Sequence, residues 1–112
     1  MKLLTISLFT LTLPCLILAN EPTSIRKEYV SRFSSIAIAQ MKKHKIPASI
    51  TLAQGILESG SGNSFLARSS NNHFGIKCGS QWKGKVSYHD DDKEKECFRA
   101  YSRVQDSYLD HS

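Results

Sequence analysis

The chain has 112 residues, of which 40% are hydrophobic and 22% are charged. This length allows one domain, and this balance of apolar and charged side chains excludes an intrinsically disordered chain. The formal net charge of +5 favours an anionic partner. No basic stripe is interleaved with aromatic residues, which argues against a nucleic-acid-binding protein.

The first 19 residues have the pattern of a secretory signal peptide. Lys2 supplies the positive start, residues 3–19 form an apolar run, and Ala19 is the small residue before the expected cleavage site. An uncleaved membrane anchor is the alternative, but the run is short for a membrane span and contains Pro14. We therefore expect export to the periplasm, the cell wall or the exterior, with no stable membrane insertion, and a mature domain over residues 20–112.

Apolar residues recur at intervals of three and four from Ile25 to Met41, which predicts an amphipathic helix. A hydroxyl side chain just before it, on Thr23 or Ser24, is expected to cap its N-terminus. The basic cluster at residues 42–45 lies at its C-terminal end, where the helix dipole favours positive charge. We expect this helix to pack against the next helix along the chain.

The stretch IPASITLAQGILESGSG, residues 46–62, predicts a second helix that ends on one acidic residue and two glycines. Pro47 suits the first turn, and Gly60 supplies a C-terminal stop. Glu58 is the only charged residue in this stretch. Its apolar neighbours and the negative end of the helix dipole both disfavour the ionised carboxylate, which suits a general acid. The alternative for a glutamate in the last turn of a helix is a solvated surface residue.

Residues 63–70 predict one further turn of helix, which the asparagine turn at 71–72 ends. The alternation of apolar residues over 74–78 then predicts a short strand. Trp82 follows in a polar turn, where its ring either stacks on a sugar or holds a hairpin together.

Residues 85–89 and 96–101 alternate in polarity on either side of an acidic turn, which predicts a β-hairpin. Three adjacent aspartates in that turn leave three interpretations open: a solvated turn, a catalytic role, and calcium binding, although they lack the spaced ligands of a dedicated calcium loop. Once the signal peptide is removed, Cys78 and Cys97 form an even pair in an exported chain. We expect a disulfide between them, closing a loop of about 20 residues.

Three separated stretches read AQGILESGSG at 53–62, NNHFGIKC at 71–78 and CFRAY at 97–101. In this order they resemble motifs of the bacterial glucosaminidase family of peptidoglycan hydrolases, which includes flagellar muramidase-like hydrolases and autolysins. The resemblance implies an α+β, lysozyme-like domain, mainly helical with a small β-hairpin lobe. It implies a glycoside hydrolase that cuts the β-1,4 bond following N-acetylglucosamine in peptidoglycan strands, without a metal or cofactor. Family members continue past the equivalent of residue 112, so we expect this domain to be incomplete at its C-terminal end.

The resemblance also implies roles for particular residues. Glu58 becomes the proton donor, while Asn72, Phe74 and Tyr101 shape the sugar cleft. Hydrolysis of a glycosidic bond usually needs two carboxyl groups, one on each side of the bond. The family places the second one, typically a glutamate, near the end of the first hairpin strand, where this sequence has no glutamate in register. Asp90 is the nearest equivalent and is the expected partner.

Several alternatives stay open at this point. A lytic transglycosylase or a muramidase of the same fold would keep Glu58 and leave different sugar ends, and a non-catalytic wall-binding module would not use Glu58 for chemistry. A small zinc module is a further alternative, because histidine and cysteine both bind zinc, although their spacing here matches no common finger. Its candidate ligands are His73, Cys78, His89 and Cys97.

Overall fold

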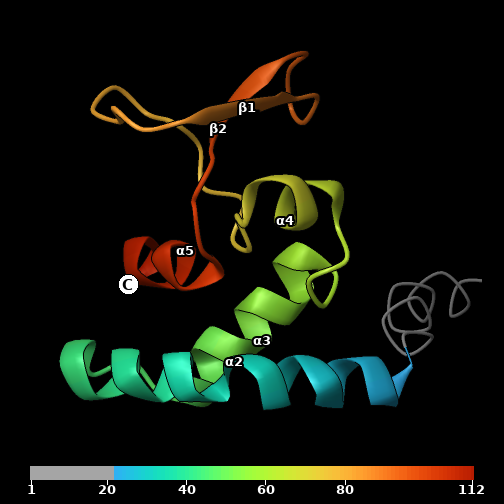
Figure 1. Cartoon of the computed structure of the whole chain (residues 1–112), viewed down its shortest axis with the longest axis vertical. Coiled ribbons are helices and arrows are strands. Elements are labelled where there is room, and N and C mark those ends of the chain that lie inside the picture. The colour runs from blue at the N-terminus through green and yellow to red at the C-terminus, as the bar shows by residue number, and fades with distance from the viewer. Residues whose placement is uncertain (1–21) are drawn as a thin grey trace, which may run out of the picture.

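The computed structural model describes residues 22–112, and the predicted signal peptide at residues 1–19 lies outside this part of the chain. Within it, four helices and one antiparallel pair of strands follow one another (Figure 1). Their bounds are α2 Thr23–His44, α3 Ala48–Ser59, α4 Phe65–Ser70, β1 Val86–His89, β2 Glu96–Arg99 and α5 Val104–His111. Among these described helices, none combines the length and the apolar character that a bilayer crossing requires.

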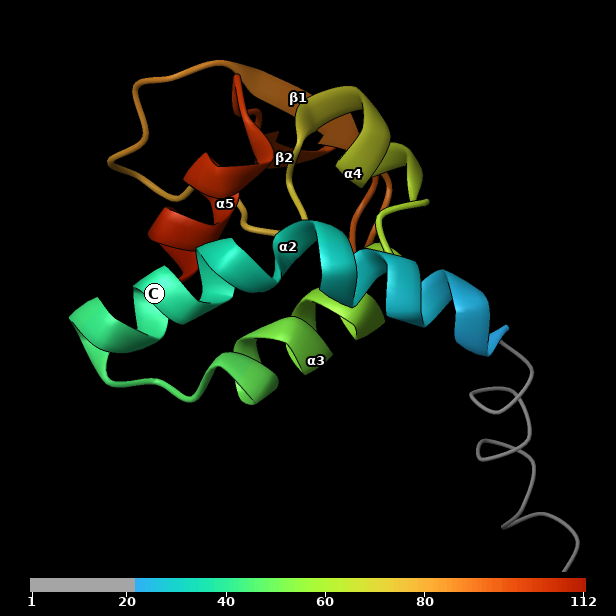
Figure 2. The same ribbon diagram turned by 60° about the horizontal axis from the view of Figure 1, so that its bottom comes forward.

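The elements form a helical lobe and a smaller hairpin lobe. Helices α2 and α3 pack against each other at one end, the hairpin β1–β2 stands at the other, and α4 and α5 lie between them (Figure 1, Figure 2). This arrangement confirms the predicted α+β class, mainly helical with a small hairpin. The junction between the two lobes is where a cleft is expected.

Helix α2 turns one face toward the core, as its periodicity predicts. The buried residues of this face are Tyr29, Phe33, Ala37 and Gln40. The predicted capping by Thr23 or Ser24 was wrong. The helix begins at Thr23, and the preceding Pro22 has no side-chain group that could accept a hydrogen bond.

Helix α3 crosses α2 at a glycine. A Cβ atom at Gly55 would lie 2.5 Å from the hydroxyl oxygen of Tyr29 and 3.0 Å from that of Tyr108. Such distances are shorter than van der Waals contact, so the absence of a side chain allows both hydroxyl groups to approach the helix. The helix ends as predicted at Gly60, which adopts a left-handed conformation with φ of 57°.

The hydroxyl groups near Gly55 belong to a buried network, here called the tyrosine–histidine cluster, of Tyr29, His73 and Tyr108. The Tyr29 hydroxyl lies 2.7 Å from Nδ1 of His73 and 2.7 Å from the Tyr108 hydroxyl. Burial, followed by the nearby positive charge of Arg32, lowers the pKa of His73 to about 4. Burial raises the pKa of Tyr29 and of Tyr108. The cluster is therefore neutral at pH 7.

The strand predicted over residues 74–78 was wrong. A single bridge between Lys77 and Phe98 is the only strand-like pairing of this segment within the described residues. Gly75 has φ of 63°, a left-handed conformation that interrupts extended backbone. In addition, the backbone N–H of Ile76 bonds to Oδ1 of Asn72, while the Ile76 carbonyl oxygen still accepts from the N–H of Arg99 in β2.

The hairpin is confirmed: β1 and β2 pair antiparallel, with Val86 opposite Arg99. The predicted disulfide between Cys78 and Cys97 is also present and joins the segment before the hairpin to β2. Because both sulfur atoms are in that bond, neither is available as a thiolate ligand, and the zinc-module alternative is excluded.

Candidate active site

Glu58 lines a groove between the two lobes, here called the Glu58 groove, with a volume of about 410 Å³. Glu58 comes from the last turn of α3, whereas His89, Asp90 and Asp91 come from the end of β1 and the turn after it. The other lining residues are Ser64, Leu66, Gly75 and Phe98. The structure thus brings Glu58 and Asp90, which are far apart in the sequence, to the walls of one groove.

Glu58 is exposed, so the expectation that apolar neighbours partly desolvate its carboxyl was wrong. Helix α3 buries only the face that carries Leu52, while Leu57, next to Glu58, is 64% exposed. The carboxyl nevertheless has a close neighbour in the segment after the asparagine turn. A Cβ atom at Gly75 would lie 3.9 Å from Oε2 of Glu58, so this segment passes beside the carboxyl.

His111 of α5 also lies near Glu58, which no motif or spacing predicts. Its ring stacks on Phe74, with centroids 4.0 Å apart and planes 6° apart. Its Nε2 lies 2.8 Å from Oε1 of Gln54, which is one turn before Glu58 on α3. Burial lowers the pKa of His111, and the negative charge of Glu58 partly offsets this effect. His111 thereby ties α5 to the helix that carries Glu58.

Asp90 is exposed at the hairpin turn. Its Oδ1 accepts a hydrogen bond of 2.8 Å from the backbone N–H of Lys95, which fixes one side of the carboxylate. The acidic residues beyond it are neutralised differently. The ammonium group of Lys77 lies 2.7 Å from an oxygen of Glu96 and 3.5 Å from an oxygen of Asp92. Lys77 thereby offsets part of the negative charge of the acidic turn.

His89 is a groove residue to which the sequence pattern assigned only a possible zinc role. It ends β1, directly before Asp90. Its ring packs edge-on against Phe65, with centroids 4.8 Å apart, and its Nε2 lies 3.0 Å from Oγ of Ser87. These contacts hold the imidazole at the groove wall.

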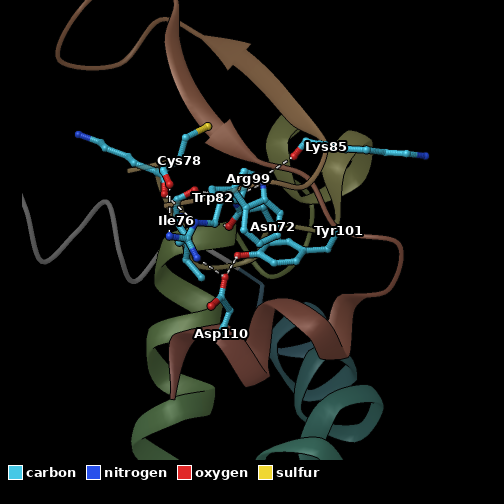
Figure 3. Close-up of polar contacts among 9 residues, drawn as sticks. Asn72, Ile76, Cys78, Trp82, Lys85, Arg99, Tyr101 and Asp110 are labelled. Carbon is cyan, nitrogen blue, oxygen red and sulfur yellow. Dashed lines mark hydrogen bonds and ion pairs between the residues drawn. The ribbon is translucent and has the colours of Figure 1, made fainter. Parts of the chain in front are cut away.

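Asn72 lies beneath the groove surface and is 1% exposed. Its Nδ2 donates to the carbonyl oxygens of Ile76 and Arg99, at 3.0 and 2.8 Å, and its Oδ1 accepts from the N–H of Ile76 at 3.0 Å (Figure 3). Phe74 is likewise buried, at 5% exposure. Both residues therefore fix the segment that passes beside Glu58, rather than presenting a free group to a ligand.

Tyr101 lines a different cavity, of about 560 Å³, together with Trp82. The two rings meet edge to face, with centroids 5.5 Å apart, and Nε1 of Trp82 donates to the carbonyl oxygen of Lys85. The Tyr101 hydroxyl donates to Oδ2 of Asp110 at 2.6 Å, which also accepts from Arg99 (Figure 3). Burial and the hydrogen bond to Asp110 raise the pKa of Tyr101. Tyr101 is thus separate from the groove that holds Glu58 and Asp90.

Comparison with known proteins gives the context of this site. The family model of glucosaminidases, described as mannosyl-glycoprotein endo-beta-N-acetylglucosaminidase, matches residues 34–112. The chain belongs to the glucosaminidase family. The matched region contains Glu58, the asparagine turn and the whole hairpin, so every residue of the Glu58 groove lies in the family domain.

Two curated relatives and one solved structure illustrate the likeness. The glucosaminidase chain is 36% identical to the exo-glucosaminidase LytG of Bacillus subtilis strain 168, over 83% of this chain and 38% of LytG. It is 33% identical to the peptidoglycan hydrolase FlgJ of Vibrio parahaemolyticus, over 76% of this chain and 31% of FlgJ. The chain therefore spans about a third of these two relatives.

The solved structure is the glycoside hydrolase domain of FlgJ from Salmonella typhimurium. It superposes with a TM-score of 0.66 at 33% identity, over 77% of this chain and 57% of that domain. This match confirms the lysozyme-like fold that the motifs implied.

Proposed function

We propose that this chain is an exported peptidoglycan hydrolase that cleaves the β-1,4 bond following N-acetylglucosamine, with Glu58 as the general acid. The observation that carries the proposal is the Glu58 groove, where one carboxyl from the helical lobe and two from the hairpin turn, Asp90 and Asp91, line the same opening. Glycosidases work with two such groups on opposite sides of the scissile bond. LytG is an exo-glucosaminidase and FlgJ a peptidoglycan hydrolase, and these activities support the choice of polymer.

In this mechanism Glu58 donates its proton to the glycosidic oxygen as the bond breaks. Asp90 either activates a water molecule or attacks the sugar, and no step requires a metal ion or cofactor. An exposed carboxyl is accessible to a long polymer, and a glycan strand lying in the groove would shield it from water. Asn72 and Phe74 are buried beneath the groove, and their role in this mechanism is to hold the backbone beside Glu58 in place.

Tyr101 has a proposed role in substrate binding rather than in bond cleavage. With Trp82 it forms an aromatic surface in the neighbouring cavity, and aromatic rings of this kind pack against the apolar faces of sugars. We propose that this surface supports the glycan strand at a distance from the bond that is cut, which gives Tyr101 a binding role without contact with the carboxylates.

The decisive test is Glu58→Gln, assayed on purified peptidoglycan. Loss of a general acid lowers a rate by about 100-fold or more, so we expect release of wall fragments to fall by at least that factor. Glu28→Gln is the matched control, because it removes the exposed carboxylate of α2 outside the groove and should leave the rate unchanged.

Mass spectrometry of the fragments tests the bond. Reducing N-acetylglucosamine ends support the proposal, whereas reducing N-acetylmuramic acid ends identify a muramidase and anhydro-sugar ends a lytic transglycosylase. Equal, non-zero hydrolysis by the parent chain and by Glu58→Gln removes Glu58 from the mechanism. Wall binding without any hydrolysis by the parent chain identifies a non-catalytic module.

A further inference from the structure

A polar pocket lies on the other side of α4 from the Glu58 groove. Leu66 lines the groove, whereas Ala67 and Arg68, the next two residues of α4, line this pocket. Its volume is about 300 Å³. We call it the arginine pocket, and its polar lining residues are Arg32, Asn63, Arg68, Asn71 and His73.

The charge of the arginine pocket is one-sided. Two guanidinium groups line it, and no carboxylate of residues 22–112 does. Within residues 22–112, the side chains of Arg32 and Arg68 make no hydrogen bond or ion pair with another residue. The Cζ atom of Arg32 lies 5.0 Å from the centroid of the Phe33 ring, so this guanidinium rests on the aromatic wall of the pocket. Glu28, the only acidic residue of α2, lines an adjoining hollow instead.

His73 forms the inner end of the pocket and is 3% exposed. The Tyr29 hydroxyl bonds to its Nδ1, and no described residue bonds to its Nε2. The Cε1 edge of the ring faces Gly62, another lining residue, because a Cβ atom there would lie 3.5 Å from Cε1. When Tyr29 donates to Nδ1, the single proton of the neutral ring is on Nε2, which is then a hydrogen-bond donor.

We propose that the arginine pocket binds the C-terminal carboxylate of a short peptide, held between Arg32 and Arg68. A guanidinium group matches the two oxygens of a carboxylate, and charge-assisted hydrogen bonds of this kind are among the strongest in proteins. Phe33 and Ala67 are buried, and the half-buried Val104 is the apolar lining residue that contacts the small alkyl side chain of a terminal residue. An inorganic phosphate ion has no apolar group that could contact Val104, so the lining favours the peptide.

Isothermal titration calorimetry and backbone amide NMR on the full chain test this proposal. The probes are N-acetyl-alanyl-alanine with a free C-terminal carboxylate, its C-terminal amide, and inorganic phosphate. We expect saturable binding of the carboxylate probe, with shifts at the amides of Gly62, Asn63 and Arg68. We expect no binding of the amide probe, because it lacks the charge that the two guanidinium groups recognise.

Variants show whether the two arginines form the site. Arg32→Gln and Arg68→Gln should each weaken binding by about tenfold or more, the loss expected for one charge-assisted hydrogen bond. Lys27→Gln is the matched control, since it removes the same charge from an exposed position of α2 outside the pocket and should bind as the parent does. Glu58→Gln should also bind normally, which separates this site from the catalytic proposal.

Four outcomes overturn the proposal: no saturation by the carboxylate probe, equal binding of the amide probe, equal weakening by Lys27→Gln, or tighter binding of phosphate than of the peptide. The near-ultraviolet circular dichroism of each variant is compared with that of the parent. If a glutamine variant is misfolded, Arg32→Lys and Arg68→Lys replace it. They keep the charge but lose the paired donors, and should still weaken binding.

Discussion

The tyrosine–histidine cluster and the Glu58 groove meet on a single turn of helix α3, and they are built in opposite ways. Gly55 faces the cluster, where two hydroxyl groups approach the bare backbone. Glu58, three residues later, is exposed on the groove wall. One face of the helix is fixed by packing, and this leaves the other face free to carry a carboxyl that a substrate can reach.

The two regions also differ in their charges. In the cluster, burial favours the neutral forms of His73, Tyr29 and Tyr108. The groove instead exposes Glu58 and Asp90 to solvent. We therefore expect substitutions in the cluster to change the free energy of unfolding, and substitutions in the groove to change activity.

The largest effect on stability is expected from Gly55→Ala. The added methyl group collides with the hydroxyls of Tyr29 and Tyr108, which costs up to about 3 kcal/mol for overpacking and about 1 kcal/mol for each buried hydrogen bond lost. The higher helix propensity of alanine compared with glycine offsets about 1 kcal/mol of this loss. The net loss of about 3 to 4 kcal/mol is measured by urea unfolding.

A control for this substitution lies on the exposed side of the same helix. Ala53→Gly changes the helix propensity without affecting packing, and it should lower the free energy of unfolding by about 1 kcal/mol. If Gly55→Ala proves neutral or stabilising, the close approach of the two hydroxyl groups to α3 is not a constraint on the fold, and the contrast between the faces of the helix fails.

The second largest effect on stability is expected from removing the disulfide that holds the hairpin. Replacing Cys78 and Cys97 with serine should lower the free energy of unfolding by about 3 kcal/mol, the value for a closed loop of this length. A two-stranded hairpin is marginal alone, so hydrogen exchange at β1 and β2 should accelerate more than at α2. Equal acceleration throughout the domain would show that the two lobes do not differ in local stability.

Acidification tests the cluster with a smaller effect. The pKa of His73 is about 4 in the folded chain and 6.5 ordinarily, so the unfolded chain binds a proton first as the pH falls. The contribution of neutral His73 to the free energy of unfolding is complete above pH 6.5 and is lost as the pH falls toward 4. Between about pH 7.5 and about pH 5 the free energy of unfolding should fall by about 2 kcal/mol.

Urea unfolding of the parent and of His73→Gln at both pH values separates this loss from that due to carboxylates, because the variant should lack it. NMR titration of the His73 ring gives the same information without a substitution. A midpoint near the ordinary value would contradict the neutral cluster.

Much of the fold could be predicted because its signals are local. The spacing of Tyr29 and Phe33 marks a helix face, Gly60 marks a helix end, and the even pair of cysteines left after the predicted signal peptide predicts a disulfide. The strand over 74–78 was wrong because Gly75 adopts a left-handed conformation and the N–H of Ile76 bonds to the side chain of Asn72, so pairing with β2 is limited to one bridge. A periodic pattern carries no information about such competition.

The site could be predicted only in part. Motif order predicts Glu58 and Asp90 as the site carboxyls, and this stays a prediction. The exposure of Glu58 depends on which face of α3 meets α2, and spacing does not show this. The stacking of His111 on Phe74 joins residues that only the tertiary fold brings together. Arg32 and Arg68 are 36 positions apart in the sequence and become neighbours through packing for the same reason.

The smallest expected change is in the stability of groove variants. Glu58→Gln and Asp90→Asn should each alter the free energy of unfolding by less than about 0.5 kcal/mol, the usual range for exposed positions. Within residues 22–112 no side chain or backbone group is hydrogen-bonded to the Glu58 carboxyl, and Asn at position 90 keeps the oxygen that accepts from Lys95. Urea unfolding measured beside wall hydrolysis should then show activity lost at unchanged stability. A change above about 1 kcal/mol would mean that the groove carboxyls also support the fold, because their loss would then act through packing or charge as a cluster residue does.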